Sequence, residues 1–133
     1  MGYEISSEYL PHFFHLKSLG EISPHGVMLI MDKLVSGPQW KPGSNLLIDY
    51  RNGIRDHFTY NDISMIAEII CSHKEKLGDG KCAFLVDNPQ ERWITRIYRF
   101  LCSGKVYNEI NIFETFDKAV SWLREENTAG ASR

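Results

Sequence analysis

Three arginines share one face of a helix predicted in the second half of the chain. Arg92, Arg96 and Arg99 are spaced i, i+4 and i+7, which places their side chains on one side of an α-helix. Guanidinium groups bind carboxylates and phosphates through paired hydrogen bonds. The stripe therefore predicts a surface for an acidic partner or a lipid head group. The alternative is a solvated helix face with no binding role.

A second group of polar residues lies where predicted strands end. Arg51, Arg55 and His57 belong to a loop before a helix that begins near Thr59, and Asn88 precedes the next helix. Open parallel sheets bind ligands beyond the carboxyl ends of their strands, and helix N-termini favour anions. These five residues predict a site for a small anion or a phosphorylated ligand.

Residue spacing gives little support for catalysis or metal binding. Asp49 and His57 are residue types that occur together in catalytic sites, but the pattern lacks a nucleophile to go with them. An aspartate that accepts loop N–H bonds at a strand end is the simpler interpretation. The histidines lack metal-ligand spacing, and no phosphate-loop, dinucleotide or Cys-x-x-Cys motif occurs. We expect no metal, cofactor or catalytic residue. The alternative is a small enzyme acting on an anionic substrate at the 51–58 loop.

Length and composition predict one globular domain over residues 1–124, followed by a frayed tail over 125–133. The chain has 133 residues, of which 43% are hydrophobic and 24% charged. Its formal charge of −2 argues against nucleic-acid binding, and no apolar run has membrane length. The start of the chain does not resemble a secretory signal, and its three cysteines are widely spaced. We therefore expect reduced thiols and a cytoplasmic protein.

Apolar blocks alternate with helical periods along the chain and predict an α/β fold of order ββαβαβαβα. The expected sheet is mixed and mostly parallel, with five strands and about four helices. Strands are expected within residues 3–19 (two) and at 46–49, 82–86 and 106–113. Helices are expected after Ser23, after Thr59 with Asp62 completing a capping box, from Pro89 to about Cys102, and after Thr115.

Two segments resemble SpoIIAA-like proteins. Phe113-Glu114-Thr115-Phe116-Asp117-Lys118-Ala119-Val120-Ser121-Trp122-Leu123 is similar to the closing segment of that family. Asn45-Leu46-Leu47-Ile48-Asp49-Tyr50-Arg51 resembles its strand that ends in aspartate and a basic residue. The resemblance implies the STAS fold, in a cytoplasmic domain related to anti-anti-sigma factors, with a distant similarity to lipid-carrying Sec14 domains. Catalysis is not typical of such domains.

The chain departs from the anti-anti-sigma pattern at one important place. Those factors carry aspartate-serine-serine-glycine at the start of the helix after the central strand, and a kinase phosphorylates the first serine. This chain has His57-Phe58-Thr59-Tyr60-Asn61-Asp62 there. Thr59 is the candidate phosphoacceptor, although capping the helix is its simpler role.

These observations predict a non-catalytic, regulatory STAS-type module that binds a protein partner or a small anionic or lipidic ligand. A set of large apolar residues is interpreted as core or as the lining of a lipid pocket. It comprises Tyr9, Phe13, Phe14, Met28, Met31 and Trp40. Because open sheets have edges that need covering, a homodimer is favoured. A purely structural subunit of an assembly remains a third hypothesis.

Overall fold

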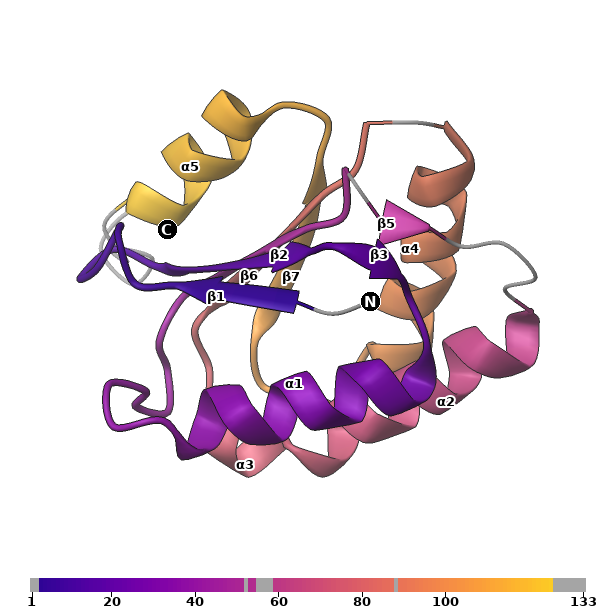
Figure 1. The fold of residues 1–133 in the computed structure, drawn as a ribbon, viewed down its shortest axis with the longest axis horizontal. Coiled ribbons are helices and arrows are strands. Elements are labelled where there is room, and N and C mark those ends of the chain that lie inside the picture. Colours follow the sequence, from indigo (N-terminus) through magenta and orange to yellow (C-terminus); the bar gives the residue numbers. More distant parts are fainter. Residues whose placement is uncertain (1–2, 52, 55–58, 88, 126–133) are drawn as a thin grey trace.

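The computed structural model describes residues 3–51, 53–54, 59–87 and 89–125, without the side chains of residues 53, 54, 90 and 91. One five-stranded sheet forms the centre of the molecule, in the order β1-β2-β4-β6-β7 (Figure 1). Its strands are β1 (Tyr3–Ser6), β2 (Phe14–Ser18), β4 (Leu46–Asp49), β6 (Lys81–Leu85) and β7 (Glu109–Phe113). Only the β1–β2 pair is antiparallel, which confirms the predicted mixed, mostly parallel sheet.

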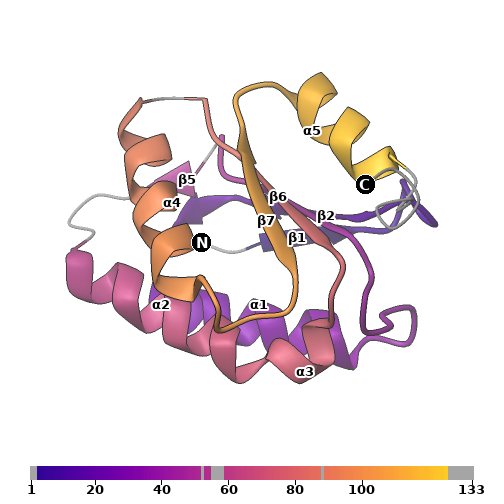
Figure 2. The same cartoon turned by 180° about the vertical axis from the view of Figure 1, so that it is seen from behind.

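Helices cover both faces of this sheet (Figures 1 and 2). One face carries α1 (Pro24–Ser36), α2 (Tyr60–Ser72), α3 (Lys74–Leu77) and α4 (Pro89–Cys102), and the other carries α5 (Phe116–Arg124). The four long helices are the predicted ones, and α3 is an additional single turn. The strand order never reverses along this sheet, so the crevice that such a reversal creates in doubly wound folds is missing.

Side-chain caps fix where three helices begin. Ser23 and Thr115 each accept a backbone N–H bond from the first turn of α1 and α5, respectively. Thr59 and Asp62 form the predicted capping box of α2. The helix starts expected after Ser23, Thr59 and Thr115 are thereby confirmed.

The last strand starts later than the alternating pattern predicts. Alternation begins at Val106, whereas β7 begins at Glu109, which pairs with Lys81 at the start of β6. Residues before Glu109 extend beyond the partner strand and have no ladder to join. A short parallel pair, β3 (Gly20–Glu21) with β5 (Gly53–Ile54), was also not predicted, because strands of two residues carry no periodic signal.

The expected aromatic and methionine cluster is divided between the two faces of the sheet. Phe13 stacks on Tyr9 on the α5 side, with ring centroids 4.9 Å apart, whereas Phe14 packs on Trp40 on the other side. Successive side chains at the start of β2 point to opposite faces, so this set cannot line one pocket. The pocket interpretation of this set is therefore wrong.

No helix in the described part of the chain has the length and apolar character needed to cross a membrane. The predicted tail lies outside the described residues from position 126 onward.

Candidate functional site

The arginine stripe of α4 forms one wall of an open groove. The groove has a volume of about 330 Å³ and runs between α4, β7 and the start of α5. Its lining residues are Arg92, Arg96, Arg99, Asn111, Ile112, Phe113, Glu114 and Lys118. We call it the basic groove, because four of these side chains are cationic and one is a carboxylate.

Only one of the four cations is neutralised within the described residues. Nη1 of Arg92 donates to Oε1 of Glu114 over 3.0 Å, while the buried Nε of Arg92 has no acceptor there. No described carboxylate forms an ion pair with Arg96, Arg99 or Lys118. Since guanidinium groups present planar forks of donors, this wall suits a carboxylate or phosphate.

The path of the chain brings Lys118 and Asn111 to this groove. After β7, Thr115 caps α5 and the chain crosses to the opposite face of the sheet, which leaves Lys118 on the first turn of α5 beside the α4 arginines. At the edge strand, the Asn111 side chain accepts the N–H of Ile112 over 3.0 Å. Lys118 is exposed, and the sequence did not connect it or Asn111 with the α4 arginines, because both belong to other elements of the chain.

The predicted anion site around Arg51 has different surroundings from those expected. Asp49 ends β4 with 1% of its side chain exposed and receives two hydrogen bonds from the Arg51 guanidinium, at 3.0 and 2.8 Å. It also accepts the Arg51 backbone N–H over 3.1 Å, as the simpler interpretation of this aspartate required. Because Arg51 already holds a carboxylate, it has less charge to offer a ligand.

A histidine from a neighbouring strand joins this ion pair. Nε2 of His15, on β2, lies 3.2 Å from Oδ2 of Asp49. Burial acts to raise the pKa of Asp49, but the hydrogen bonds from His15 and Arg51 outweigh it and hold the pKa well below its ordinary 3.8. The same carboxylate raises the pKa of Arg51. The group is a buried charge network that ties β2 and β4 to the following loop.

The other predicted loop residues divide into two groups. Arg55, His57 and Asn88 lie outside the described residues. Thr59 is exposed, and its Oγ1 accepts the backbone N–H of Asp62 over 3.1 Å. The threonine thus has a structural role, while its phosphorylation stays a prediction.

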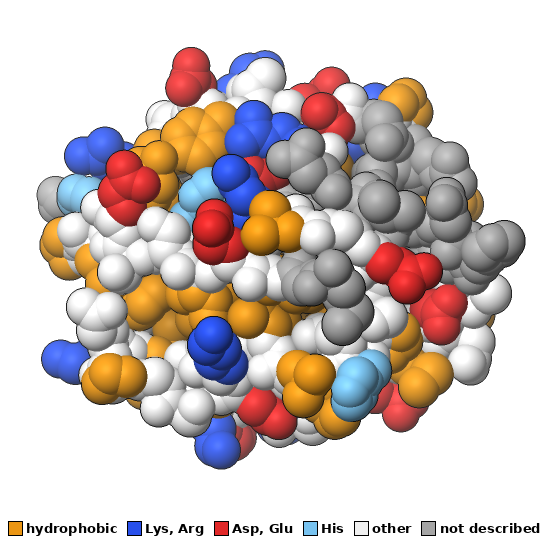
Figure 3. All heavy atoms as spheres, in the orientation of Figure 1, with side chains coloured by type: hydrophobic (Ala, Val, Ile, Leu, Met, Phe, Trp, Pro, Cys, Tyr) orange, Lys and Arg blue, Asp and Glu red, His pale blue; other side chains and the backbone are white. Residues whose placement is uncertain are grey.

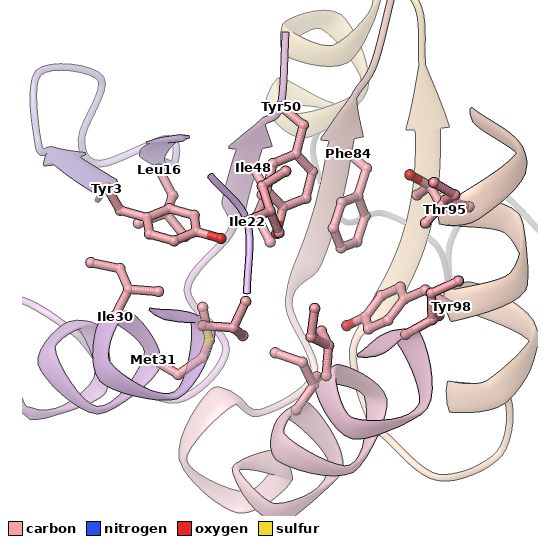
Figure 4. Close-up of a pocket in the computed structure, with 15 residues that line it drawn as sticks. Tyr3, Leu16, Ile22, Ile30, Met31, Ile48, Tyr50, Phe84, Thr95 and Tyr98 are labelled. Carbon is pink, nitrogen blue, oxygen red and sulfur yellow. The ribbon is translucent and has the colours of Figure 1, made fainter. Parts of the chain in front are cut away.

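An apolar cavity lies between the sheet and the helices α1, α2 and α4 (Figure 4). Leu16, Ile48 and Phe84 project from the sheet, Met31 from α1, and Tyr98 from α4 with its hydroxyl toward the cavity. Hydrophobic side chains are also visible in a band between β1 and α1 (Figure 3). Only about 30 Å³ of the cavity is open to a water-sized molecule. Pockets for drug-sized ligands measure about 300–1,000 Å³, so the free space in this cavity is about ten times too small for such a ligand.

Filling this cavity should stabilise the protein. Val27 is buried on α1 and lines the cavity, so Val27→Ile adds a methylene where space exists. We expect a gain of about 0.5–1 kcal/mol in the free energy of unfolding. Urea unfolding would measure it, with Val35→Ile as the control, because Val35 lies on the same helix without lining the cavity. A lower free energy of unfolding for Val27→Ile would mean that the space around Val27 is already fully packed.

Comparison with known proteins identifies the fold. The chain is similar to an uncharacterised protein of the DUF3478 family from Shewanella loihica PV-4, which has a SpoIIAA-like fold. The two share 17% sequence identity with a TM-score of 0.59, and the match covers 92% of each chain. No protein-family model matches the chain, and no curated protein is a significant match. The chain therefore adopts a SpoIIAA-like fold, as the two quoted segments predicted.

Proposed function

We propose that this SpoIIAA-like domain is a non-catalytic binding module whose basic groove receives an anionic group of a ligand or partner. The observation that carries the proposal is the charge imbalance of the groove. Arg96, Arg99 and Lys118 have no ion pair among the described residues, and Glu114 neutralises only Arg92. Cations brought together in a concave surface favour a ligand of opposite charge.

The described polar residues support binding better than catalysis. His15 and Asp49 resemble two members of a catalytic triad, but among the described residues the His15 ring contacts the Asp49 carboxylate and the rings of Tyr9 and Phe116. None of these offers an activated nucleophile. A small enzyme at the 51–58 loop remains the alternative proposal.

Anion binding at the groove can be tested with inorganic pyrophosphate and amide NMR. We expect its largest chemical-shift changes on α4 and on residues 111–118. Arg96→Glu should weaken binding at least about 5-fold, since it replaces attraction by repulsion, and added salt should weaken it further. Lys33→Glu is the charge-matched control, because Lys33 is exposed on α1 and does not line the groove.

The same titration separates the alternatives. Shifts concentrated on residues 51–59 would transfer the site to the predicted loop and favour the enzyme hypothesis. Equal weakening by Arg96→Glu and Lys33→Glu would mean that pyrophosphate senses only overall charge, and the groove proposal would be withdrawn.

A lipid chain in the apolar cavity is a second candidate ligand. It is supported by the almost wholly apolar lining, which includes Leu16, Ile48 and Phe84. Because the cavity is narrow, a lipid would have to displace α1 or α2 from the sheet. Native mass spectrometry of freshly purified protein should then reveal a co-purifying molecule of defined mass, and its absence would remove this candidate.

We place the module in the cytoplasm. Cys71, Cys82 and Cys102 are free thiols, as a reducing compartment requires. Burial raises the pKa of both Cys82 and Cys102 to about 12, so these thiols stay protonated and unreactive.

A further inference from the structure

Two large aromatic side chains stand in solvent beside the basic groove. Trp93 is 64% exposed and Phe100 is 79% exposed, and both lie on α4. The side of α4 that packs on the sheet is occupied by Thr95, Tyr98 and Cys102, which are buried. The exposed aromatics therefore contribute nothing to the core, and exposing them to water is unfavourable unless something covers them.

The aromatics and the arginines form one continuous surface. Arg96 is three residues after Trp93 and four before Phe100, so the three side chains are neighbours on the same helix face. Arg92 and Arg99 extend that face to the basic groove. Tryptophan and arginine are the residues most enriched among those that dominate binding energy at protein interfaces.

We propose that this surface docks an acidic polypeptide segment that carries a large apolar side chain next to its carboxylates. The proposal rests on the anion-binding role of the basic groove and names its partner. Carboxylates of the segment enter the groove between the arginines and Lys118, and the apolar side chain covers Trp93 and Phe100.

Shape and charge favour a polypeptide over an anionic membrane. The cations line a concave groove, which a peptide carboxylate can enter and a flat bilayer cannot follow. The formal charge of the whole chain is −2, so no general attraction holds it to an anionic surface. Arginine also binds carboxylates through two parallel hydrogen bonds, which gives directional recognition.

Two fluorescent peptides of equal charge would test the proposal. One is rich in glutamate with a central pair of leucines, and the other has serines in place of the leucines. We expect the leucine peptide to bind about 10-fold more tightly. Trp93→Ala and Phe100→Ala should remove this advantage while changing the affinity for the serine peptide less than about 2-fold. Alanine is a better helix former than either aromatic residue, so α4 is retained.

Controls locate the effect on this surface. Leu29→Ala removes a comparably exposed apolar side chain from α1 and should leave both affinities unchanged. Arg96→Glu should weaken both peptides, because it acts through the groove. Equal affinity for the two peptides in the wild type, or an advantage that survives both aromatic substitutions, would overturn this inference.

Other outcomes would identify a different occupant or a different failure. Binding to phosphatidylserine vesicles that is lost in Trp93→Ala, with no peptide preference, would mean that the surface meets a membrane. A dimer seen by sedimentation that dissociates in Trp93→Ala would mean that it meets a second copy. Either result overturns the peptide partner.

The two proposals fail in different ways. If pyrophosphate and both peptides fail to bind, the proposed anion-binding function is wrong. If pyrophosphate binds and neither peptide does, only the peptide inference is wrong.

Discussion

Asp49→Asn is expected to lower the free energy of unfolding by about 3 kcal/mol at neutral pH. Asp49 is 1% exposed and holds both Arg51 and His15, so the substitution removes charge-assisted hydrogen bonds that water cannot replace at that position. Asparagine keeps the shape but offers one acceptor oxygen in place of two. The Arg51 side chain is 37% exposed and can be rehydrated, which keeps the cost below that of a fully buried unpaired charge.

The effect of pH gives the same prediction an independent readout. The pKa of Asp49 is held below its ordinary 3.8 in the folded state, so its stabilisation is complete above that ordinary value. As the pH falls below 3.8 toward the lower folded pKa, the unfolded state takes up the proton first and the stabilisation is lost. The difference between wild type and Asp49→Asn should therefore shrink on acidification.

Urea unfolding at neutral pH and at about pH 3 would measure both effects. Asp79→Asn is the control, because Asp79 is exposed and undergoes the same chemical change. A loss below about 1 kcal/mol with an unchanged pH profile would mean that the network adds little to stability. It would also reopen a functional role for the contact between His15 and Asp49.

Local sequence signals were sufficient for much of the fold because they act within a few residues. The caps at Ser23, Thr59 and Thr115 are contacts with the following turn, and the structure confirms all three. The buried block at 46–49 likewise forms a predicted strand, which lies at the centre of the sheet. Such features need no knowledge of distant chain segments.

The site residues that the sequence did not reveal depend on contacts between distant segments. His15 reaches Asp49 because β2 and β4 pair in a register that places Lys17 opposite Asp49. From the sequence, only His57, eight positions away, was considered as a partner of Asp49, and that pair was rejected in favour of an aspartate that accepts loop N–H bonds. Lys118 joins the α4 arginines because the chain changes face after β7. Neither register nor a change of face leaves a periodic pattern.

The close approach of two turns has the same origin. The segment Gly78-Asp79-Gly80 predicts a turn from composition alone, but composition does not say what the turn touches. In the structure it packs backbone to backbone against the segment around Gly43, whose N–H donates to the Leu77 carbonyl over 2.9 Å. This contact joins the end of α3 to the loop before β4.

Gly78→Ala is therefore expected to destabilise the protein by at least about 3 kcal/mol, or to prevent folding. A Cβ at this position would lie against the backbone nitrogen of Gly43 and 2.8 Å from the carbonyl carbon of Pro42. Neither backbone atom can move without disturbing the turn. Gly78 also has φ 77° and ψ −158°, a conformation that is nearly restricted to glycine.

Gly104→Ala is the control for the positive φ of Gly78. Gly104 has the same φ of 77°, but no heavy atom lies within 4 Å of a Cβ built there. The Gly104→Ala variant should therefore lose only about 1 kcal/mol of unfolding free energy, because alanine is strained at a positive φ. Thermal and urea unfolding of both variants would measure the difference, which reports what Gly78 adds beyond a positive φ, namely its extended ψ and its contact with the segment around Gly43. Equal losses of stability in the two variants would mean that the Gly78 turn separates easily from the segment around Gly43. Their contact would then not hold α3 against the loop before β4.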